Sequence, residues 1–341
     1  MMMKQVELVR PRVFALRQVP RPKPAPNEAL IRVKAVGICG SDIHAYYGEH
    51  PFMSCPIVMG HEAAGEIVEL GAEAAGLSVG QRVVLRPQQV CGACHMCRHG
   101  RYNICRDLKV IGCQSTGASS EYFSADASLF YPLPDALPYD EGTMIEPLAV
   151  GIHAVKQAGD VRGKNILVIG AGTIGNLLAQ SAMAMGAAKV MITDVADQKL
   201  RLARQCGIPC PVNVAGQDLG RAMEEAFGPD GADAVYECSA NPRALDQILT
   251  LARKGIPIVV VGVYSGHAPV NLANLQDREY RLIGSLMYVH EDYVQAIELA
   301  GAGKIQLRPL ISREFPLEQA QEAYRYIEAQ KGLAQKVILT V

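Results

Sequence analysis

The sequence predicts an α/β protein in which a β-rich domain is joined to a doubly wound parallel sheet. Short apolar strands punctuated by glycine dominate the chain to about residue 135, whereas strand-like and helical runs alternate after about residue 148. Such alternation is typical of βαβ units, which build a parallel sheet with helices on both faces. The length of 341 residues agrees with roughly two domains.

In the first part, strands are expected between turn residues, at 29–36, 63–70 and 81–85. In the second part, strands are expected at 165–169, 189–193, 232–237, 257–262 and 281–285, and helices at 173–185, 197–206 and 242–252. The last fifty residues carry helical patterns at 292–300 and 317–329 and a closing strand at 336–341. We interpret this final segment as the chain crossing back to complete the first domain.

Composition argues against several classes of protein. The formal net charge is −1 and no basic stripe is present, so a nucleic-acid partner is not expected. The longest apolar stretch, residues 256–264, is far shorter than the ~20 residues of a membrane span. The N-terminal segment also lacks the apolar core of a signal peptide. We therefore expect a cytoplasmic, reducing setting, in which clustered cysteines bind metals more often than they form disulfides.

A cluster of four cysteines gives the strongest signal for a metal. Cys91, Cys94 and Cys97 follow one another at three-residue steps, and Cys105 comes eight residues later. Thiolates at this spacing suit a tetrahedral zinc site. Four protein ligands leave no open position on the metal, so the expected role is structural.

A glycine-rich turn directly follows the expected strand 165–169 and opens a helix. Gly170, Gly172 and Gly175 would allow a tight turn, close approach of a pyrophosphate and close packing of helix on strand. The intervening Thr173 and Ile174 begin the helix, whose free N–H groups can bind phosphate. The pattern alone is weak, but its position between strand and helix predicts a dinucleotide site.

Asp194 ends the next expected strand, nineteen residues after Gly175. A carboxylate at this place accepts hydrogen bonds from ribose hydroxyls and would repel a 2′-phosphate. The sequence therefore favours NAD over NADP.

A short stretch near residue 40 combines a possible metal ligand with two proton carriers. Cys39 offers a thiolate, while Ser41 and His44 offer a hydroxyl and an imidazole that can pass a proton. Alone, a cysteine flanked by glycine is usually only a packed side chain. The pair His61 and Glu62 is equally unremarkable when taken alone. The same holds for Glu146, which gains meaning from its position just before the domain change.

With these motifs assembled, the chain resembles the zinc-dependent medium-chain dehydrogenase/reductase family over essentially its whole length. Within that family it is most similar to polyol dehydrogenases of the sorbitol, iditol or xylitol type, because residues 146–153 read Glu-Pro-Leu-Ala-Val-Gly-Ile-His. The resemblance implies a GroES-like β domain at 1–152 and 290–341 and an inserted Rossmann domain at 153–289.

The resemblance also implies the roles of the site residues. A catalytic zinc would be held by Cys39, His61 and Glu62, with Glu146 as a near or transient ligand. Ser41 and His44 occupy proton-relay positions. Tyr46 and Met287 occupy substrate-pocket positions. Two zinc ions per chain and NAD follow as cofactors.

The activity implied is transfer of a hydride from a secondary hydroxyl of a polyol to NAD+, giving a ketose. L-threonine, 2,3-butanediol or a sugar-alcohol phosphate stay open as alternative substrates. Met287 stands where animal sorbitol dehydrogenases carry arginine, and residues 116–122 depart from the usual Gly-Gly-x-x-Ala-Glu-Tyr. A non-catalytic relative is disfavoured because the whole ligand set is kept. Family members pair their Rossmann sheets edge to edge, so a homodimer or homotetramer is expected, with residues 268–272 as the edge strand.

Overall fold

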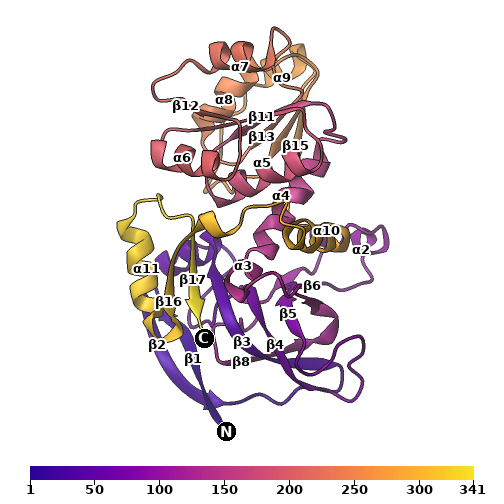
Figure 1. Cartoon of the computed structure of the whole chain (residues 1–341), viewed down its shortest axis with the longest axis vertical. Helices are drawn as coiled ribbons and strands as arrows, with labels where there is room; N and C mark the ends of the chain where they lie inside the picture. Colours follow the sequence, from indigo (N-terminus) through magenta and orange to yellow (C-terminus); the bar gives the residue numbers. More distant parts are fainter. The chain divides into compact units, whose positions relative to one another are not determined.

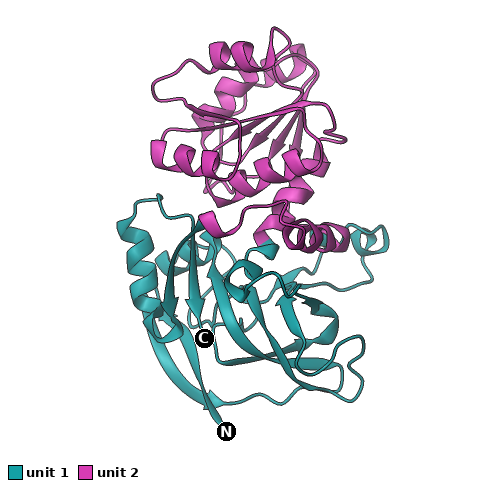
Figure 2. Ribbon diagram, in the orientation of Figure 1, with its two compact units in different colours: residues 1–146, 311–341 teal, residues 147–310 magenta.

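The computed structural model describes residues 1–341, which form two compact units (Figure 2). Unit 1 contains residues 1–146 and 311–341, and unit 2 contains residues 147–310. These limits differ from the expected boundaries at residues 152 and 290. The reason lies in helix α10 (His290–Gly301), whose Asp292 is tied to helix α4 (Ile145–Gln157) by hydrogen bonds to His153 and Lys156.

Unit 1 is built on a seven-stranded sheet with the order β16-β17-β3-β4-β5-β9, in which β8 also pairs with β3. The central pair is antiparallel, and Ile31 faces Ile67 across it, both without exposed surface. The expected strands of this part are present as β3, β4 and β5, and the closing strand β17 pairs with β3 as the return of the chain requires. The strands of the unit are β1 (Met2–Arg10), β2 (Val13–Pro20), β3 (Glu28–Ile38), β4 (Glu62–Leu70), β5 (Arg82–Leu85), β6 (Gln88–Gln89), β7 (Lys109–Val110), β8 (Tyr122–Asp126), β9 (Phe130–Pro132), β16 (Ile311–Pro316) and β17 (Lys336–Thr340).

Helices in unit 1 are short and lie between strands. They are α1 (Gly40–Tyr47), α2 (His95–Arg98), α3 (Tyr139–Gly142) and α11 (Ala320–Ala329), with 3₁₀ turns at Tyr102–Ile104, Ala127–Leu129 and Leu317–Gln319. The single helix expected at 317–329 is therefore a 3₁₀ turn followed by α11.

Unit 2 is a six-stranded parallel sheet with the order β12-β11-β10-β13-β14-β15. Helices α5 and α6 lie on one side of it and α7, α8 and α9 on the other (Figure 1), each side with its own apolar cluster. The strand order reverses between β10 and β13, which is where doubly wound sheets bind their ligands. This confirms the predicted doubly wound parallel sheet.

The elements of unit 2 that were expected match their ranges to within a few residues. The strands are β10 (Asn165–Ile169), β11 (Lys189–Asp194), β12 (Cys210–Asn213), β13 (Ala234–Glu237), β14 (Pro257–Val260) and β15 (Arg281–Gly284). Besides α4 and α10 the helices are α5 (Thr173–Ala184), α6 (Asp197–Gln205), α7 (Leu219–Phe227), α8 (Pro242–Leu251) and α9 (Leu272–Asp277), and a 3₁₀ turn covers Arg308–Leu310. None of the helices reaches the length and apolarity that a membrane span requires.

Several features of unit 2 differ from the sequence analysis, which did not expect helices α4, α7 and α9. Strand β12 was not anticipated, because it is four residues long and contains Pro211, which only an edge strand tolerates. The prediction of an edge strand at 268–272 was wrong, because that segment contains no strand. Its Asn271 instead caps α9 by accepting a hydrogen bond from the Asn274 N–H. The edge on that side of the sheet is β15.

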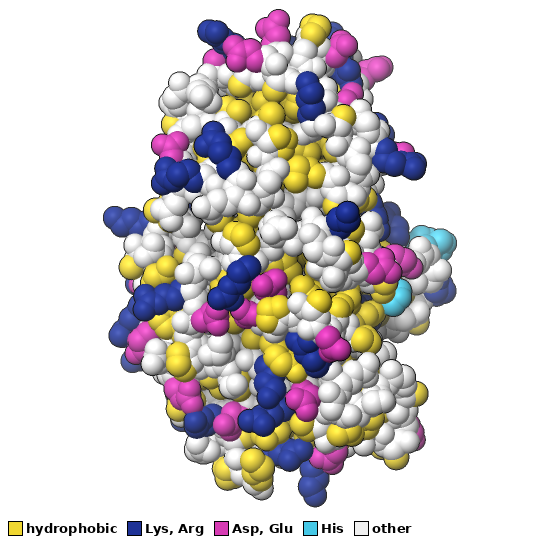
Figure 3. Space-filling model, in the orientation of Figure 1, with side chains coloured by type: hydrophobic (Ala, Val, Ile, Leu, Met, Phe, Trp, Pro, Cys, Tyr) yellow, Lys and Arg dark blue, Asp and Glu magenta, His cyan; other side chains and the backbone are white.

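The side chains on the face drawn in Figure 3 carry both signs of charge. Lys and Arg are interspersed with Asp and Glu over both units, as the net charge of −1 suggests.

Replacement of Asp292 by asparagine is expected to make unfolding less dependent on acid. Burial opposes ionisation of this carboxyl, but hydrogen bonds from His153 and Lys156 outweigh burial and hold its pKa below the usual range. The unfolded pKa is about 3.9, so this contribution is present above that value and is lost as the pH falls through the folded-state pKa. Near neutral pH the variant should lose about 2 kcal/mol of unfolding free energy, and the difference from the unaltered protein should shrink below about pH 4.

Urea unfolding of both proteins between neutral and acid pH measures this difference. Asp230→Asn, in an exposed loop of the same unit, is the control and should show no such trend. A constant difference at every pH would contradict the assignment.

Candidate functional site

Three predicted metal ligands meet at the ends of two neighbouring strands in unit 1. Cys39 follows β3 and precedes α1, while His61 and Glu62 lie at the start of β4, where Glu62 faces Gly37 of β3. The thiol, imidazole and carboxylate donor atoms all lie within 4.8 Å of one another. His61 and Glu62 are buried, and Cys39 is partly exposed. A cysteine, a histidine and a carboxylate form a donor set that zinc accepts, with one position left open.

Asp42 is a site residue that the sequence analysis missed. Its Oδ2 accepts a bond from the Cys39 N–H at 2.9 Å, and its Oδ1 lies 3.6 Å from His61 Nδ1. Both Oδ1 and Nδ1 are buried without a hydrogen-bond partner. A histidine bound to a metal commonly directs its other ring nitrogen to a carboxylate, so this arrangement fits a metal at His61. The signal in the sequence is an aspartate three residues after the cysteine, in the first turn of α1.

Burial and neighbouring charge act differently on the pKa values of Asp42 and His61. Burial raises the pKa of Asp42. Burial also opposes protonation of His61, yet the negative charges of Asp42 and Cys39 raise its pKa well above the ordinary value. The negatively charged neighbours of His61 therefore favour its protonated form.

Lys336 is the second residue that sequence reasoning missed. Its Nζ donates to both carboxylate oxygens of Glu62, at 2.7 and 2.6 Å, and to the Ile38 carbonyl at 3.2 Å, and the side chain is buried. Gly37 makes room for this pair, because a Cβ there would lie 2.2 Å from Glu62 Oε2. No local pattern could reveal the contact, since Lys336 lies 274 residues beyond Glu62, on the closing strand β17.

The ammonium group keeps its charge in this buried place. Burial lowers the pKa of Lys336, but Glu62 and Cys39 outweigh it and the net shift is upward, with Glu146 contributing in the same direction. Glu146, in the first turn of α4 and buried, thus belongs to the same group of charges. Lys336 and a metal ion would compete for the Glu62 carboxylate.

Replacement of Lys336 by methionine is expected to destabilise the metal-free protein more than the zinc-loaded protein. Removal of one partner of a buried ion pair leaves an uncompensated charge and costs about 3–5 kcal/mol. Zinc would supply the missing positive charge to Glu62, so the loss should be smaller when zinc is bound. Thermal unfolding before and after chelation measures both values.

Lys4→Met serves as the matched control. Lys4 pairs with Glu318 on the surface of unit 1, where both side chains are about two-fifths exposed, and such pairs contribute roughly 0–1 kcal/mol. Equal destabilisation of the two Lys336→Met forms would argue against a metal beside Glu62.

The proposed proton carriers lie on one side of α1. Ser41 is partly exposed and His44 is exposed, and their spacing of three residues places them on the same face of the helix.

A buried thiol that the sequence analysis did not consider, Cys113, lies beside His61, and burial raises its pKa while the bond to His61 lowers it. The surroundings of His61 therefore contain two thiols, one of them outside the predicted ligand set.

The two residues expected at the substrate differ in their placement. Tyr46 is only 3% exposed, its ring centroid lies 5.0 Å from that of Tyr324, and Gln321 donates to its hydroxyl at 3.2 Å. Tyr46 thus packs in the core of unit 1, and its predicted contact with substrate stays a prediction. Met287 is half-buried in the loop after β15 and has a φ of +49°, a left-handed conformation that is uncommon for residues with a side chain.

The four cysteines of the predicted structural site also come together. Neighbouring sulfurs lie 3.5–4.0 Å apart, and a tetrahedron with Zn–S bonds of ~2.3 Å has edges of ~3.8 Å. Backbone N–H groups point at the sulfurs, and those of Arg106 and Cys97 lower the pKa of Cys94 to about 6. The four sulfurs therefore lie close enough to bind one tetrahedral cation.

In unit 2 the glycine-rich turn forms a cradle at the end of β10. Gly170 has a φ of +97°, and a Cβ on Gly175 would lie 1.9 Å from the Gly170 carbonyl oxygen, so both positions require glycine. Around Gly172 a Cβ would meet no atom within 4 Å, which leaves open space at the N-terminus of α5. Thr173 and Ile174 form the first turn of that helix. Open space beside free helix N–H groups fits a pyrophosphate.

Asp194 ends β11 and organises the neighbouring turns. Its Oδ2 accepts from the Ala171 N–H at 2.9 Å, its Oδ1 accepts from the Val195 and Ala196 N–H groups, and Lys199 Nζ lies 3.9 Å away. The carboxylate is thus fixed beside the glycine turn, where an adenosine ribose would lie in a doubly wound fold.

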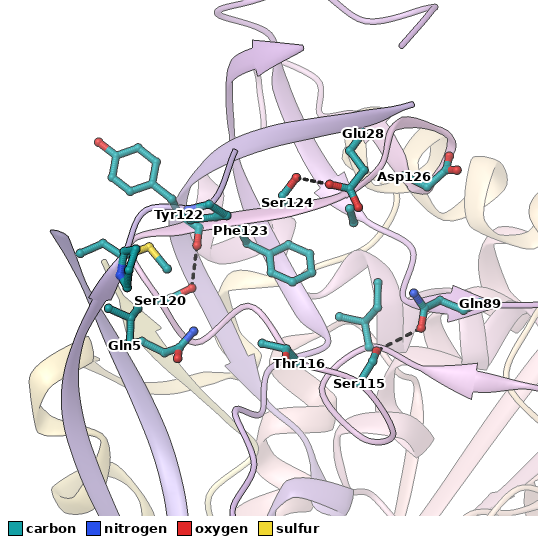
Figure 4. A pocket seen from close by; sticks show the side chains of 16 residues that line it. Gln5, Glu28, Gln89, Ser115, Thr116, Ser120, Tyr122, Phe123, Ser124 and Asp126 are labelled. Atoms are coloured by element: carbon teal, nitrogen blue, oxygen red, sulfur yellow. Dashed lines mark hydrogen bonds between the residues drawn. The ribbon is translucent and has the colours of Figure 1, made fainter. Parts of the chain in front are cut away.

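A separate cavity of about 620 Å³ in unit 1 contains none of the predicted site residues (Figure 4). Its serine hydroxyls are hydrogen-bonded within the protein: Ser115 donates to Gln89, Ser120 to the Tyr122 carbonyl and Ser124 to Glu28. The cavity is therefore distinct from the candidate metal and nucleotide sites.

Comparison with known proteins identifies two family matches along the chain. Residues 25–135 match the alcohol dehydrogenase GroES-like domain, and residues 173–302 match the zinc-binding dehydrogenase family. Sorbitol dehydrogenase of Bacillus subtilis is 32% identical over 94% of this chain and 92% of its own length. L-idonate 5-dehydrogenase of Vitis vinifera is 34% identical over 94% of this chain and 90% of its own.

Solved structures show the same architecture. A zinc-binding dehydrogenase from Sinorhizobium meliloti, bound to NADP, superposes with a TM-score of 0.91 over all of both chains at 30% identity. The matched families, the relatives and the two donor groups together confirm the GroES-like domain and the Rossmann sheet. The chain belongs to the zinc-dependent medium-chain dehydrogenase/reductase family, close to its polyol dehydrogenases, and is an oxidoreductase with a nucleotide cofactor.

Proposed function

We propose that the protein oxidises a secondary hydroxyl of a polyol to a ketone and passes the hydride to NAD+. The observation that carries this proposal is the donor group of Cys39, His61 and Glu62, in which Asp42 lies beside His61 and Lys336 holds Glu62. The sorbitol and L-idonate relatives support an open-chain substrate with several hydroxyls.

The residues of unit 1 have distinct parts in this proposal. A zinc ion held by Cys39, His61 and Glu62 would act as a Lewis acid that lowers the pKa of the substrate hydroxyl. Ser41 would accept the released proton, since it lies two residues from Cys39 and is accessible. His44, exposed on the same face of α1, would pass the proton to solvent. A second route, in which water beside Glu146 carries the proton away, is chemically possible as well.

Ser41→Ala separates the two proton routes. If Ser41 carries the proton, its loss should slow hydride transfer roughly 10²–10⁴-fold, the usual contribution of general acid–base catalysis. Single-turnover kinetics across pH measures the step. An unchanged rate across pH would remove Ser41 from the relay and leave the route beside Glu146.

The preference for NAD rests on Asp194. Its carboxylate would repel a 2′-phosphate, while Lys199, 3.9 Å away, offsets part of that charge. One similar structure is a complex with NADP, so both cofactors belong in the test. We propose NAD as the preferred cofactor.

Reduced nicotinamide should be monitored with a panel of hydroxyl compounds and both cofactors. The panel contains sorbitol, xylitol, iditol, L-idonate, galactitol 1-phosphate, L-threonine and 2,3-butanediol. Reduction of NAD+ by polyols supports the proposal. Reduction by L-threonine or butanediol alone would favour the alternative substrates, and no turnover of any compound by a zinc-loaded protein would contradict the proposal.

We also propose two zinc ions per chain and a homo-oligomer that pairs β15 with its copy. Strand β15 has one neighbour, β14, and Leu282 on it and Leu286 after it are 37% and 51% exposed. An unpaired apolar edge is commonly covered in the native assembly. Light scattering that shows a monomer would overturn this part. The cytoplasmic setting stays a prediction from the use of cysteine.

A further inference from the structure

A fully buried carboxylate in unit 2 has no part in the proposal so far. Glu237 is the last residue of β13 and has no exposed surface. In the parallel register it lies beside Ile169, which ends β10, and beside Val260, which ends β14. It therefore sits at the carboxyl edge of the sheet, next to the point where the strand order reverses. In folds of this kind the dinucleotide crosses that edge.

Each donor that the structure records on this carboxylate is neutral. Oε1 accepts from the Ser239 N–H at 2.7 Å and from the Ser239 hydroxyl, and Oε2 accepts from the Tyr264 hydroxyl at 2.9 Å and the Ala240 N–H at 3.3 Å. A buried charge without a cation is costly unless hydrogen bonds compensate it. The buried charge of Glu237 therefore depends on these four donors for its stabilisation. They come from two different loops.

The same carboxylate sets the path of both loops. Ala240, in the loop after β13, has a φ of +52°, a left-handed conformation that costs an alanine roughly 1–2 kcal/mol. In the loop after β14, a Cβ on Gly262 would lie 2.5 Å from the Ala240 nitrogen and 3.0 Å from Glu237 Oε2. The loops touch, and Glu237 lies between them.

This pair of loops reaches the glycine cradle. A Cβ on Gly170 would lie 3.0 Å from the Ser239 nitrogen, so the first glycine of the cradle packs directly on the loop that Glu237 holds. The Cys238 N–H donates to the Ile169 carbonyl at 2.8 Å, immediately before that glycine. A shift of Ser239 would therefore move the backbone that is placed to bind the pyrophosphate.

We propose that Glu237 is a positioning residue for the dinucleotide, and that Tyr264, by its hydrogen bond to Glu237, locks the loops after β13 and β14 against the glycine cradle. The inference rests on the proposed function, because it requires a dinucleotide at that cradle. Tyr264 is half-buried against the apolar cluster on the α7 and α8 side of the sheet, so its ring keeps its place when the hydroxyl is removed.

Tyr264→Phe removes one donor from the carboxylate and changes little else. The dissociation constant for NADH, measured by fluorescence titration of the zinc-loaded protein, should rise roughly tenfold, as expected for loss of a hydrogen bond to a charged group. The KM for NAD+ should rise in parallel, and kcat at saturating NAD+ should change less than about twofold, because no reacting atom is touched. Glu237→Gln should weaken NADH binding further.

Tyr280→Phe is the matched control. Tyr280 is buried in the same unit and donates its hydroxyl to the Ala252 carbonyl, but it immediately precedes β15 and so lies at the amino edge of the sheet. Both tyrosine variants should lower the midpoint of thermal unfolding by similar amounts. Only Tyr264→Phe should weaken NADH binding.

The results separate this inference from the proposed function. NADH binding by Tyr264→Phe that equals binding by the unaltered protein would overturn the inference and leave the proposed function standing. Equal weakening in Tyr280→Phe would reduce the effect to general destabilisation and would also overturn it. Failure of the unaltered protein to bind NADH and NADPH would overturn both. If Glu237→Gln does not fold, Tyr264→Phe with its control decides the question.

Discussion

Replacement of Cys39 by alanine is expected to lower the zinc content from two ions per chain to one and to reduce kcat/KM by roughly a thousandfold or more. The thiolate is one of three donors within 4.8 Å, so its loss leaves only the imidazole and the carboxylate. Asp42 faces the imidazole, and Lys336 donates to both carboxylate oxygens. Without the thiolate, these internal partners should outcompete a zinc ion.

The fold should survive this change. Cys39 lies between β3 and α1 and is partly exposed, and its backbone N–H remains bonded to Asp42. Elemental analysis and thermal unfolding measure zinc content and stability in one preparation. Cys210→Ala, another partly exposed cysteine that belongs to neither donor group, is the control and should keep both zinc ions and the activity. A fully active preparation of the unaltered protein with one zinc per chain would refute the division into two sites.

Features that depend on local spacing could be predicted from the sequence. The four-cysteine lobe, the glycine turn after β10 and the aspartate that ends β11 each place their chemistry within a few dozen residues, so periodicity and turn chemistry locate them. The three candidate catalytic ligands needed more than spacing. They meet because β3 and β4 pair with Gly37 opposite Glu62, and the resemblance to a family supplied that pairing in advance.

Features that depend on distant contacts could not be predicted. Lys336 reaches Glu62 only because β17 pairs with β3, and no property of residues 336–340 marks that lysine as buried. The packing of Tyr46 could not be foreseen either, because its neighbours in the core, Phe14 and Tyr324, come from opposite ends of the chain. In the sequence, Glu237 is the end of an ordinary strand, and nothing in the pattern predicts its hydrogen bonds to two loops.

Replacement of Cys97 by alanine is expected to unfold the cysteine lobe while the nucleotide site of unit 2 persists. Within residues 91–110 only Asn103 and Cys105 are buried, and regular structure is limited to a four-residue helix, a 3₁₀ turn and a two-residue strand. So little apolar burial cannot hold the lobe in one conformation. Bound metal has to supply that free energy, and structural zinc contributes about 10 kcal/mol or more in small zinc domains.

Limited trypsin digestion measures the state of the lobe directly. Arg98, Arg101 and Arg106 are exposed but lie on backbone that the sulfurs organise, because the Cys94 and Asp107 N–H groups bond to Cys91 and Cys105. Cys97→Ala should be cut within 98–109 much faster than the unaltered protein, and chelation should reproduce that pattern. Cys39→Ala should stay resistant, since its missing ligand lies outside the lobe. Equal resistance of Cys97→Ala would contradict this expectation, because it would mean that packing alone maintains the lobe.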